Sequence, residues 1–187
     1  MNLEEDKILL ENINSDPQQF GVLFDLHYKK IFRYIMRRTL DYDLSHDIAA
    51  ETFTKAFLNI SRFKINNVPI LYWLYRIATN ELNTYFRKQK YIPSLLDLLL
   101  EKESFDVKNH ESYEEEKQKL EEELKHYEDF IIIQSKLRLL PEKYQEVIAL
   151  RFFEDKSIKE ISKILNKREG TIKSLLSRGL EKLRHLL

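Results

Sequence analysis

The sequence predicts an all-α fold made of two small helical domains joined by an acidic linker. Glycine occurs three times and proline four times among 187 residues, so few positions interrupt a helix. Apolar residues recur at helical spacing in residues 1–90 and 130–187, whereas the pattern weakens between these segments. We therefore expect an N-terminal domain over residues 1–90, a linker over 91–129 and a C-terminal domain over 130–187.

Three long helices are expected in the N-terminal domain. The first begins at Asp16, which is predicted to be its N-cap and is followed by proline, and the helix carries an apolar stripe. The second follows a polar break at residues 41–45 and buries one face that includes Thr52. The third opens at Pro69, and we assign Trp73 on its apolar face to the core rather than to a stacking platform. These helices should form a compact bundle that ends near residue 90.

Four shorter helices are expected in the C-terminal domain, at about residues 130–139, 141–153, 157–165 and 169–185. Ser157 and Glu160 form a Ser-x-x-Glu capping box directly before an apolar pattern. Residues 166–169 make the turn between the last two helices. The spacing therefore predicts a C-terminal helix-turn-helix.

Charge is distributed unevenly, although 31 basic residues balance 31 acidic ones. Residues 1–100 hold 13 Lys+Arg against 12 Asp+Glu, a net charge of +1. Residues 101–130 hold 5 against 12, a net of −7, and residues 131–187 hold 13 against 7, a net of +6. A basic C-terminal module behind an acidic segment favours nucleic-acid binding.

Several function classes lack the residues that they need. The chain has no cysteine, its five histidines are scattered without ligand spacing, and three glycines cannot build a phosphate-binding loop. We therefore expect no catalytic site, no cofactor and no metal. No apolar run approaches the roughly 20 residues of a membrane span, and the acidic start is not a secretory signal. A cytoplasmic binding protein is the simplest prediction.

The last helix presents a polar face opposite its apolar one. Polar and cationic residues near its N-terminus suit a recognition helix, which directs such residues at base edges and phosphates. The candidate duplex contacts are Lys167, Arg168, Thr171, Lys173, Ser174, Ser177 and Arg178. Periodicity alone fits an ordinary helical hairpin with a basic solvated face equally well.

A second polar stripe follows the third helix of the N-terminal domain. Its cations, amides and aromatic ring are what a single-strand binder needs. The candidates on this helix are Tyr72, Arg76, Asn80, Asn83 and Arg87. Asn66 and Asn67 in the preceding loop either hold an extruded base by its Watson–Crick edge or simply form a turn.

Both domains resemble one family of transcription factors. Residues 139–151 (LLPEKYQEVIALR) and 170–178 (GTIKSLLSR) resemble region 4 of sigma-70-family factors. Residues 47–56 (DIAAETFTKA) resemble region 2.2, and residues 69–80 (PILYWLYRIATN), followed by Arg87, resemble regions 2.3 and 2.4. The order of the motifs, without room for regions 1.1 and 3, is similar to that of the extracytoplasmic-function (group IV) sigma factors.

The resemblance implies a function and partners. Asp47, Glu51 and Thr52 would dock on the clamp coiled coil of the largest subunit of core RNA polymerase. The third helix and its loop would capture the melted −10 promoter element, and the last helix would read the −35 element as duplex. An anti-sigma factor is a further implied partner. The alternative is a stand-alone helix-turn-helix transcriptional regulator that works without polymerase.

The linker and a few departures from the family pattern complete the prediction. The acidic stretch 111–123 either follows basic channels of the polymerase or is a solvated helix that keeps the basic domain off DNA. Departures lie at residues 45–46, where Ser-His replaces an acidic pair, and at Ala50, Thr84 and Arg168. These departures leave the helical pattern intact.

Overall fold

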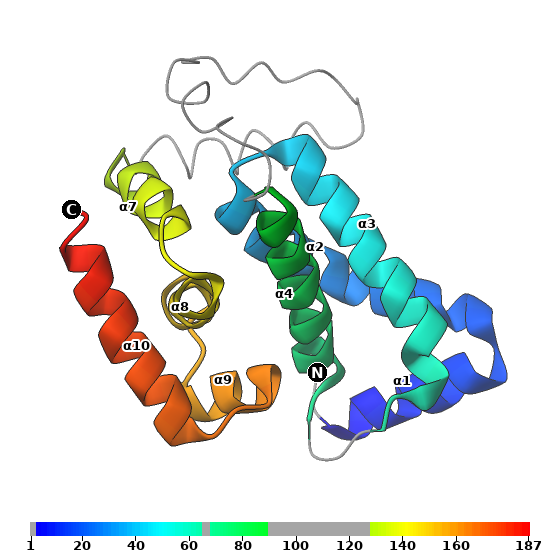
Figure 1. Ribbon diagram of the computed structural model, residues 1–187. Coiled ribbons are helices and arrows are strands. Elements are labelled where there is room, and N and C mark those ends of the chain that lie inside the picture. Colours follow the sequence, from blue (N-terminus) through cyan, green and yellow to red (C-terminus); the bar gives the residue numbers. More distant parts are fainter. Residues whose placement is uncertain (1–2, 65–67, 90–127) are drawn as a thin grey trace.

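The computed structural model describes residues 3–64, 68–89 and 128–187, and every regular element in these ranges is a helix. This confirms the all-α prediction. An N-terminal bundle (α1–α4) and a C-terminal bundle (α7–α10) lie side by side (Figure 1). The helices of the N-terminal bundle are α1 (Leu3–Ser15), α2 (Phe20–Thr39), α3 (Tyr42–Asn59) and α4 (Ile70–Gln89). Nearly all of the predicted linker lies outside the described residues.

The predicted polar break at residues 41–45 is too long, because residues 42–45 belong to α3 and the break is confined to residues 40–41. Leu40 ends α2 in a left-handed conformation with a φ of 53°. Asp41 is then the N-cap of α3, and its Oδ1 accepts a hydrogen bond from the Leu44 N–H at 3.0 Å. A polar residue at this place satisfies an otherwise free N–H of the first turn. The first predicted boundary also shifts, because residues 17–19 form a short 3-10 turn before α2.

Helix α1 was missing from the prediction. Its Leu9 and Ile13 are buried at helical spacing, a signal that only two residues carry. Asp6 is 1% exposed, and its Oδ2 accepts a hydrogen bond from the backbone N–H of Ile70 at 2.9 Å. This carboxylate therefore satisfies a free N–H at the start of α4.

Helices α2, α3 and α4 pack against one another around an apolar core. Tyr34 is fully buried there, with its hydroxyl 2.9 Å from Thr79 Oγ1 and its ring edge-on to Tyr75. Trp73 packs at the margin of this core, where its ring stacks on Phe63 with centroids 4.5 Å apart. The side of α4 that faces α2 and α3 is thus fixed by apolar packing.

The C-terminal bundle is organised around one short central helix. Its elements are α7 (Glu128–Arg138), α8 (Glu142–Ile148), a π-helical turn η3 (Ala149–Phe153), α9 (Ile158–Leu165) and α10 (Glu169–Arg184). Every residue from Tyr144 to Leu150 is buried, which places α8 at the centre of the bundle. The 141–153 prediction therefore corresponds to α8 and η3 together.

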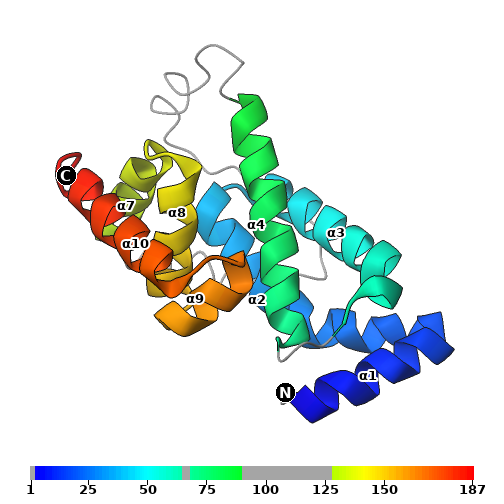
Figure 2. The same ribbon diagram turned by 60° about the horizontal axis from the view of Figure 1, so that its bottom comes forward.

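The two bundles touch along α4 and α2. Helix α4 contacts α8 and α9, while α2 contacts α7 and η3. Figure 2 shows α9 beside α4, with α10 on the far side of α8 and α9. The C-terminal bundle therefore covers one side of α4, and α10 faces away from it.

Candidate nucleic-acid interfaces

A capping box starts α9 and fixes the entry into the helix-turn-helix. Ser157 Oγ accepts a hydrogen bond from the Glu160 N–H at 3.3 Å, and Glu160 Oε2 accepts one from the Ser157 N–H at 2.8 Å. This is the reciprocal arrangement that the Ser-x-x-Glu pattern predicts. Helix α9 ends at Asn166, whose left-handed backbone (φ 52°) turns the chain toward α10.

Helix α10 lies against α8 through its apolar side. Ile172, Leu176 and Leu183 are buried there together with Gly179. A Cβ added at Gly179 would lie 3.1 Å from Ile148 Cδ1 and within 3.2 Å of Tyr144 Cβ, so glycine permits this close approach. Since this side packs inward, the opposite side of α10 is turned to solvent.

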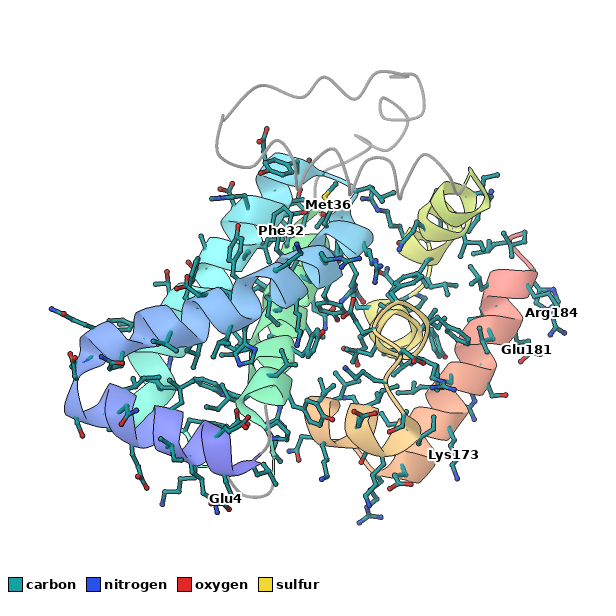
Figure 3. The ribbon with its side chains drawn as sticks, turned by 180° about the vertical axis from the view of Figure 1, so that it is seen from behind. Glu4, Phe32, Met36, Lys173, Glu181 and Arg184 are labelled. Atoms are coloured by element: carbon teal, nitrogen blue, oxygen red, sulfur yellow. The ribbon has the colours of Figure 1, made fainter. Side chains whose placement is uncertain are left out.

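All seven residues predicted to contact duplex DNA are exposed and lie between the turn before α10 and the middle of that helix. They are Lys167, Arg168, Thr171, Lys173, Ser174, Ser177 and Arg178. Figure 3 shows Lys173, Glu181 and Arg184 projecting from α10 away from the rest of the protein. The seven predicted residues, which we call the α10 face, combine cations that suit phosphates with hydroxyls that suit base edges.

The residues predicted on α4 meet different surroundings. Asn80 and Arg87 are exposed, whereas Tyr72, Arg76 and Asn83 are partly buried against the C-terminal bundle. We call these five residues the α4 face. The two loop asparagines, Asn66 and Asn67, lie outside the described residues.

Helix α9 occupies the N-terminal half of the α4 face. The Tyr72 hydroxyl donates a hydrogen bond to Glu160 Oε1. Arg76 donates from Nε to the Ile164 carbonyl at 2.8 Å and from Nη2 to the Lys163 carbonyl at 2.7 Å. Carbonyls in the last turn of a helix lack partners within it, so the guanidinium satisfies the end of α9.

Carboxylates of α8 and of the turn after η3 continue this contact. Asn83 Nδ2 donates to Glu146 Oε2 at 3.0 Å. The Tyr75 hydroxyl donates to Glu154 Oε2 at 2.6 Å, and Arg37 Nη1 lies 3.4 Å from Glu154 Oε1. Three glutamates of the C-terminal bundle therefore face polar groups of the N-terminal bundle.

Burial affects the three glutamates differently. It raises the pKa of Glu146 and Glu154 above the ordinary value of 4.5, and hydrogen bonds from Asn83 and Tyr75 only partly oppose it. Burial also acts to raise the pKa of Glu160, but hydrogen bonds from Tyr72 and Ser157 outweigh it and lower that pKa to about 2. The contact between the bundles thus includes two carboxylates whose charged form is penalised by burial.

The three glutamates were not predicted as partners of α4. Each glutamate lies 63 to 88 residues along the chain from the α4 residue that donates a hydrogen bond to it. No local spacing marks such a pair, because helical periodicity relates only neighbouring turns. Glu160 had been recognised solely as a capping residue.

On α3, the predicted polymerase-binding residues separate into exposed and buried ones. Asp47 and Glu51 are exposed, and Glu51 pairs with Lys55 at 3.2 Å. Thr52 is fully buried, and its Oγ1 donates to the Ile48 carbonyl at 2.7 Å. The predicted direct contact of Thr52 with polymerase is therefore wrong, because its side chain is buried inside the bundle and its hydroxyl is hydrogen-bonded there.

Two further properties concern the described residues only. Within residues 3–64, 68–89 and 128–187, no group of three or more His, Asp or Glu side chains is placed to hold a metal ion. In the same ranges, no helix is both long and apolar enough to cross a membrane.

Comparison with known proteins identifies both bundles. The Sigma-70 region 2 family model matches residues 23–91, and the Sigma-70, region 4 model matches residues 130–183. The chain is 34% identical to ECF RNA polymerase sigma factor SigW of Bacillus subtilis, over 92% of this chain and 90% of the relative. It is 30% identical to RNA polymerase sigma factor SigZ of the same organism, over 88% and 85%.

Solved structures share the fold. CnrH in complex with the cytosolic domain of CnrY matches with a TM-score of 0.59 at 20% identity, over 97% of this chain and 96% of that chain. The sigma factor RpoE in complex with the anti-sigma factor NepR from Bartonella quintana matches with a TM-score of 0.59 at 21% identity, over 90% and 96%.

These matches establish the class of transcription factor that the sequence motifs predicted. The chain belongs to the ECF sigma factors of the sigma-70 family, and it therefore functions as an RNA polymerase sigma factor. The alternative of a stand-alone helix-turn-helix regulator is not favoured, because the matches cover both bundles in the family's order.

Proposed function

We propose that the chain binds core RNA polymerase and directs initiation by reading two promoter elements. The α10 face would read the −35 element as duplex, and the α4 face with its preceding loop would capture the melted −10 strand. The observation that carries this proposal is the α10 face itself, where all seven predicted contacts are exposed together.

For the −35 element, the proposed contacts divide by chemistry. Lys167 and Arg168 stand at the N-terminus of α10, where free backbone N–H groups also attract phosphate. Lys173 and Arg178 extend the positive surface, and the hydroxyls of Ser174 and Ser177 lie between them, that of Ser174 donating to the Thr171 carbonyl at 2.9 Å with its oxygen still able to accept. The phosphate contacts would set affinity and its salt dependence, and the base-edge contacts would set sequence preference.

For the −10 element, we propose binding to single-stranded DNA along α4. Asn80 and Arg87 are accessible in the structure. Tyr72, Arg76 and Asn83 carry the right donors, but the C-terminal bundle accepts hydrogen bonds from all three. Contact between these three residues and DNA would require the bundles to move apart.

Other partners follow from the same proposal. The exposed carboxylates of Asp47 and Glu51 on α3 are candidates for docking on the clamp coiled coil of core polymerase. An anti-sigma factor is the regulator we propose, since the sigma factor RpoE, which shares this fold, was solved in complex with one. The mechanism we propose is binding without catalysis, in the cytoplasm where core polymerase works.

The experiment combines the purified full chain with core RNA polymerase. We expect the two to elute together in size-exclusion chromatography. Transcription from a fragmented genomic library should then start at discrete sites that share −35 and −10 sequences. Core polymerase alone is the control. Failure to co-elute, together with start sites no different from those of core alone, would refute the proposal.

A further inference from the structure

Hydrogen-bond donors along the middle of α4 already have acceptors supplied by the C-terminal bundle. From Tyr72 to Asn83 the helix advances about 16 Å at 1.5 Å per residue. Along this length Tyr72, Tyr75, Arg76 and Asn83 each donate to an acceptor on the other bundle. The cover therefore extends over several turns of the helix rather than touching it at one point.

The covering acceptors belong to the same chemical classes as those of DNA. Glu160 and Glu146 present carboxylate oxygens, and the end of α9 presents backbone carbonyls. Phosphates and base edges likewise present anionic oxygens and carbonyl groups. A hydroxyl or guanidinium that donates to one of these acceptors is not free to donate to another in the same direction. Closure of the bundles and strand binding at these side chains therefore exclude each other.

A polar contact of this kind is suited to opening. Arg38 Nη2 lies 3.3 Å from Gln145 Oε1, and Glu154, with its side chain only 10% exposed, faces Tyr75 and Arg37. Interfaces between domains of one chain are typically more polar than permanent ones, and relative motion of the domains is expected unless the interface is large and apolar. Burial also penalises the charge on Glu154, as the raised pKa of its carboxyl indicates.

The α10 face stays accessible while three of the five residues of the α4 face, Tyr72, Arg76 and Asn83, are covered. Helix α10 packs against α8 and α9, which lie between it and α4 (Figure 1). The closed chain can therefore present the residues proposed for duplex DNA and withhold three of the α4 residues proposed for the single strand, leaving Asn80 and Arg87 accessible.

We propose that the C-terminal bundle is an intramolecular inhibitor of −10 strand binding, with Glu160, Glu154 and Glu146 holding the donors of α4 and its neighbours until the bundles separate. This inference rests on the proposed strand-binding role of α4. It predicts that free strand and C-terminal bundle compete for one surface, so that the observed affinity for the strand is reduced by the fraction of closed chains.

The test begins with the distance between the bundles. The chain has no cysteine, so Leu58→Cys on α3 and Glu181→Cys on α10, both exposed, can carry two spin labels. Pulsed electron spin resonance on the otherwise wild-type chain should give one narrow distance. A saturating pool of random single-stranded DNA should shift the distribution to longer distances. A broad distribution without DNA, or no shift with DNA, would overturn the inference.

An opening variant then tests the competition. Arg37→Ala/Glu154→Ala removes contacts between the bundles without altering any residue assigned to DNA. The control Lys30→Gln/Asp155→Asn removes the same charges from exposed positions of α2 and of the turn after η3. By fluorescence anisotropy, the opening variant should bind the DNA pool at least about tenfold more tightly than the wild type. The control should match the wild type in both distance and affinity.

The outcomes separate this inference from the proposed function. Longer distances in the opening variant with unchanged strand affinity would overturn the inhibition, whatever the transcription result. Conversely, a chain that neither binds core polymerase nor starts transcription would refute the proposed function while the distance measurement still reported closure. The circular dichroism of the opening variant checks its helical content, and the wild-type distance experiment remains decisive if that variant fails to fold.

Discussion

The α10 face and the α4 face are built from similar residues, yet the structure treats them differently. Both combine cations with hydroxyl or amide donors on the outer side of a helix. On α10 these side chains are exposed, whereas on α4 three of the five donate hydrogen bonds to the C-terminal bundle. Helical spacing thus identifies the side that a helix turns away from its own bundle. It does not reveal that another bundle covers that side.

The largest expected effect concerns the exposed face. Lys173→Ala/Arg178→Ala should weaken binding to a −35 duplex by on the order of 100-fold or more, since each such contact is worth about 1–3 kcal/mol. Both side chains are exposed, so the fold should persist. Electrophoretic mobility shift with duplexes selected in the transcription experiment measures the effect.

A matched control shows whether the weaker duplex binding depends on the position of the two cations or only on the loss of positive charge. Lys182→Ala/Arg184→Ala removes two cations from the last turn of the same helix. A recognition helix uses its N-terminal residues at the base edges, so this control should bind nearly as well as the wild type. An equal loss in both variants would mean that α10 attracts DNA only through its total charge.

The next effect concerns a buried imidazole in the N-terminal bundle and the pH dependence of stability. His27 in α2 is 4% exposed, and neither ring nitrogen has a hydrogen-bond partner among the described residues. Burial, with a smaller contribution from Lys30, lowers its pKa from 6.5 to about 4. The neutral imidazole is therefore compatible with the fold above pH 6.5. Stability should be lost as the pH falls from there through 4, because the unfolded chain binds the proton more readily.

The measurement compares the wild type with His27→Leu. Between pH 7 and pH 4, the free energy of unfolding of the wild type should fall by about 2–3 kcal/mol more than that of the variant. Fluorescence of Trp73, the single tryptophan, reports on the N-terminal bundle. His185→Leu, at an exposed position, should retain the wild-type dependence. Identical pH profiles for His27→Leu and the wild type would exclude the buried imidazole as the cause.

A third prediction concerns the close packing that holds α10 against α8. Gly179→Val should destabilise the C-terminal bundle by about 1–3 kcal/mol, because the added carbons would overlap Ile148 and Tyr144. Hydrogen exchange of the α8 and α10 amides measures this loss. Gly170→Val is the control, since a Cβ there meets nothing within 4 Å. The close helix contact would be disproved if both substitutions cost the same.

The smallest expected effect lies in the helix that covers α4. Ser157→Ala removes the side-chain cap of α9 and should destabilise that helix by about 1 kcal/mol. Faster amide exchange confined to α9 is the expected observation. Ser157→Asp keeps an oxygen acceptor and should exchange like the wild type. Equally fast amide exchange in the two variants would show that the Ser157 hydroxyl does not stabilise α9 as a cap.

Local patterns predicted most of this fold. The capping box before α9 and the apolar stripes of α2 and α4 are properties of single helices, so the sequence displays them directly. Helix α1 escaped prediction because much of its burial depends on contacts outside itself, including that of Asp6 with Ile70. The burial of Thr52 was predicted correctly, because it shares the apolar side of α3 with Ile48 and Phe53, whereas its assignment to polymerase binding came from the family resemblance alone.

The two candidate interfaces differ in predictability for the same reason. The α10 face could be predicted because one helix contains all of its residues apart from the two in the preceding turn. The covered state of the α4 face depends on pairs such as Asn83 with Glu146, which meet only after both bundles have folded and packed. Charge complementarity between distant segments has no spacing rule in the sequence.

The hydrogen bond from Ile70 to Asp6 also has a consequence in time. Helix α1 is synthesised before α4, and the partner of its buried carboxylate lies 64 residues later in the chain. At about 5–20 residues per second, roughly 3–13 s pass before that partner is made. During this interval α1 lacks the start of α4, to which its buried carboxylate is hydrogen-bonded in the folded bundle. Folding of the N-terminal bundle on the ribosome is thus expected to begin with α2 and α3 and to recruit the first helix last.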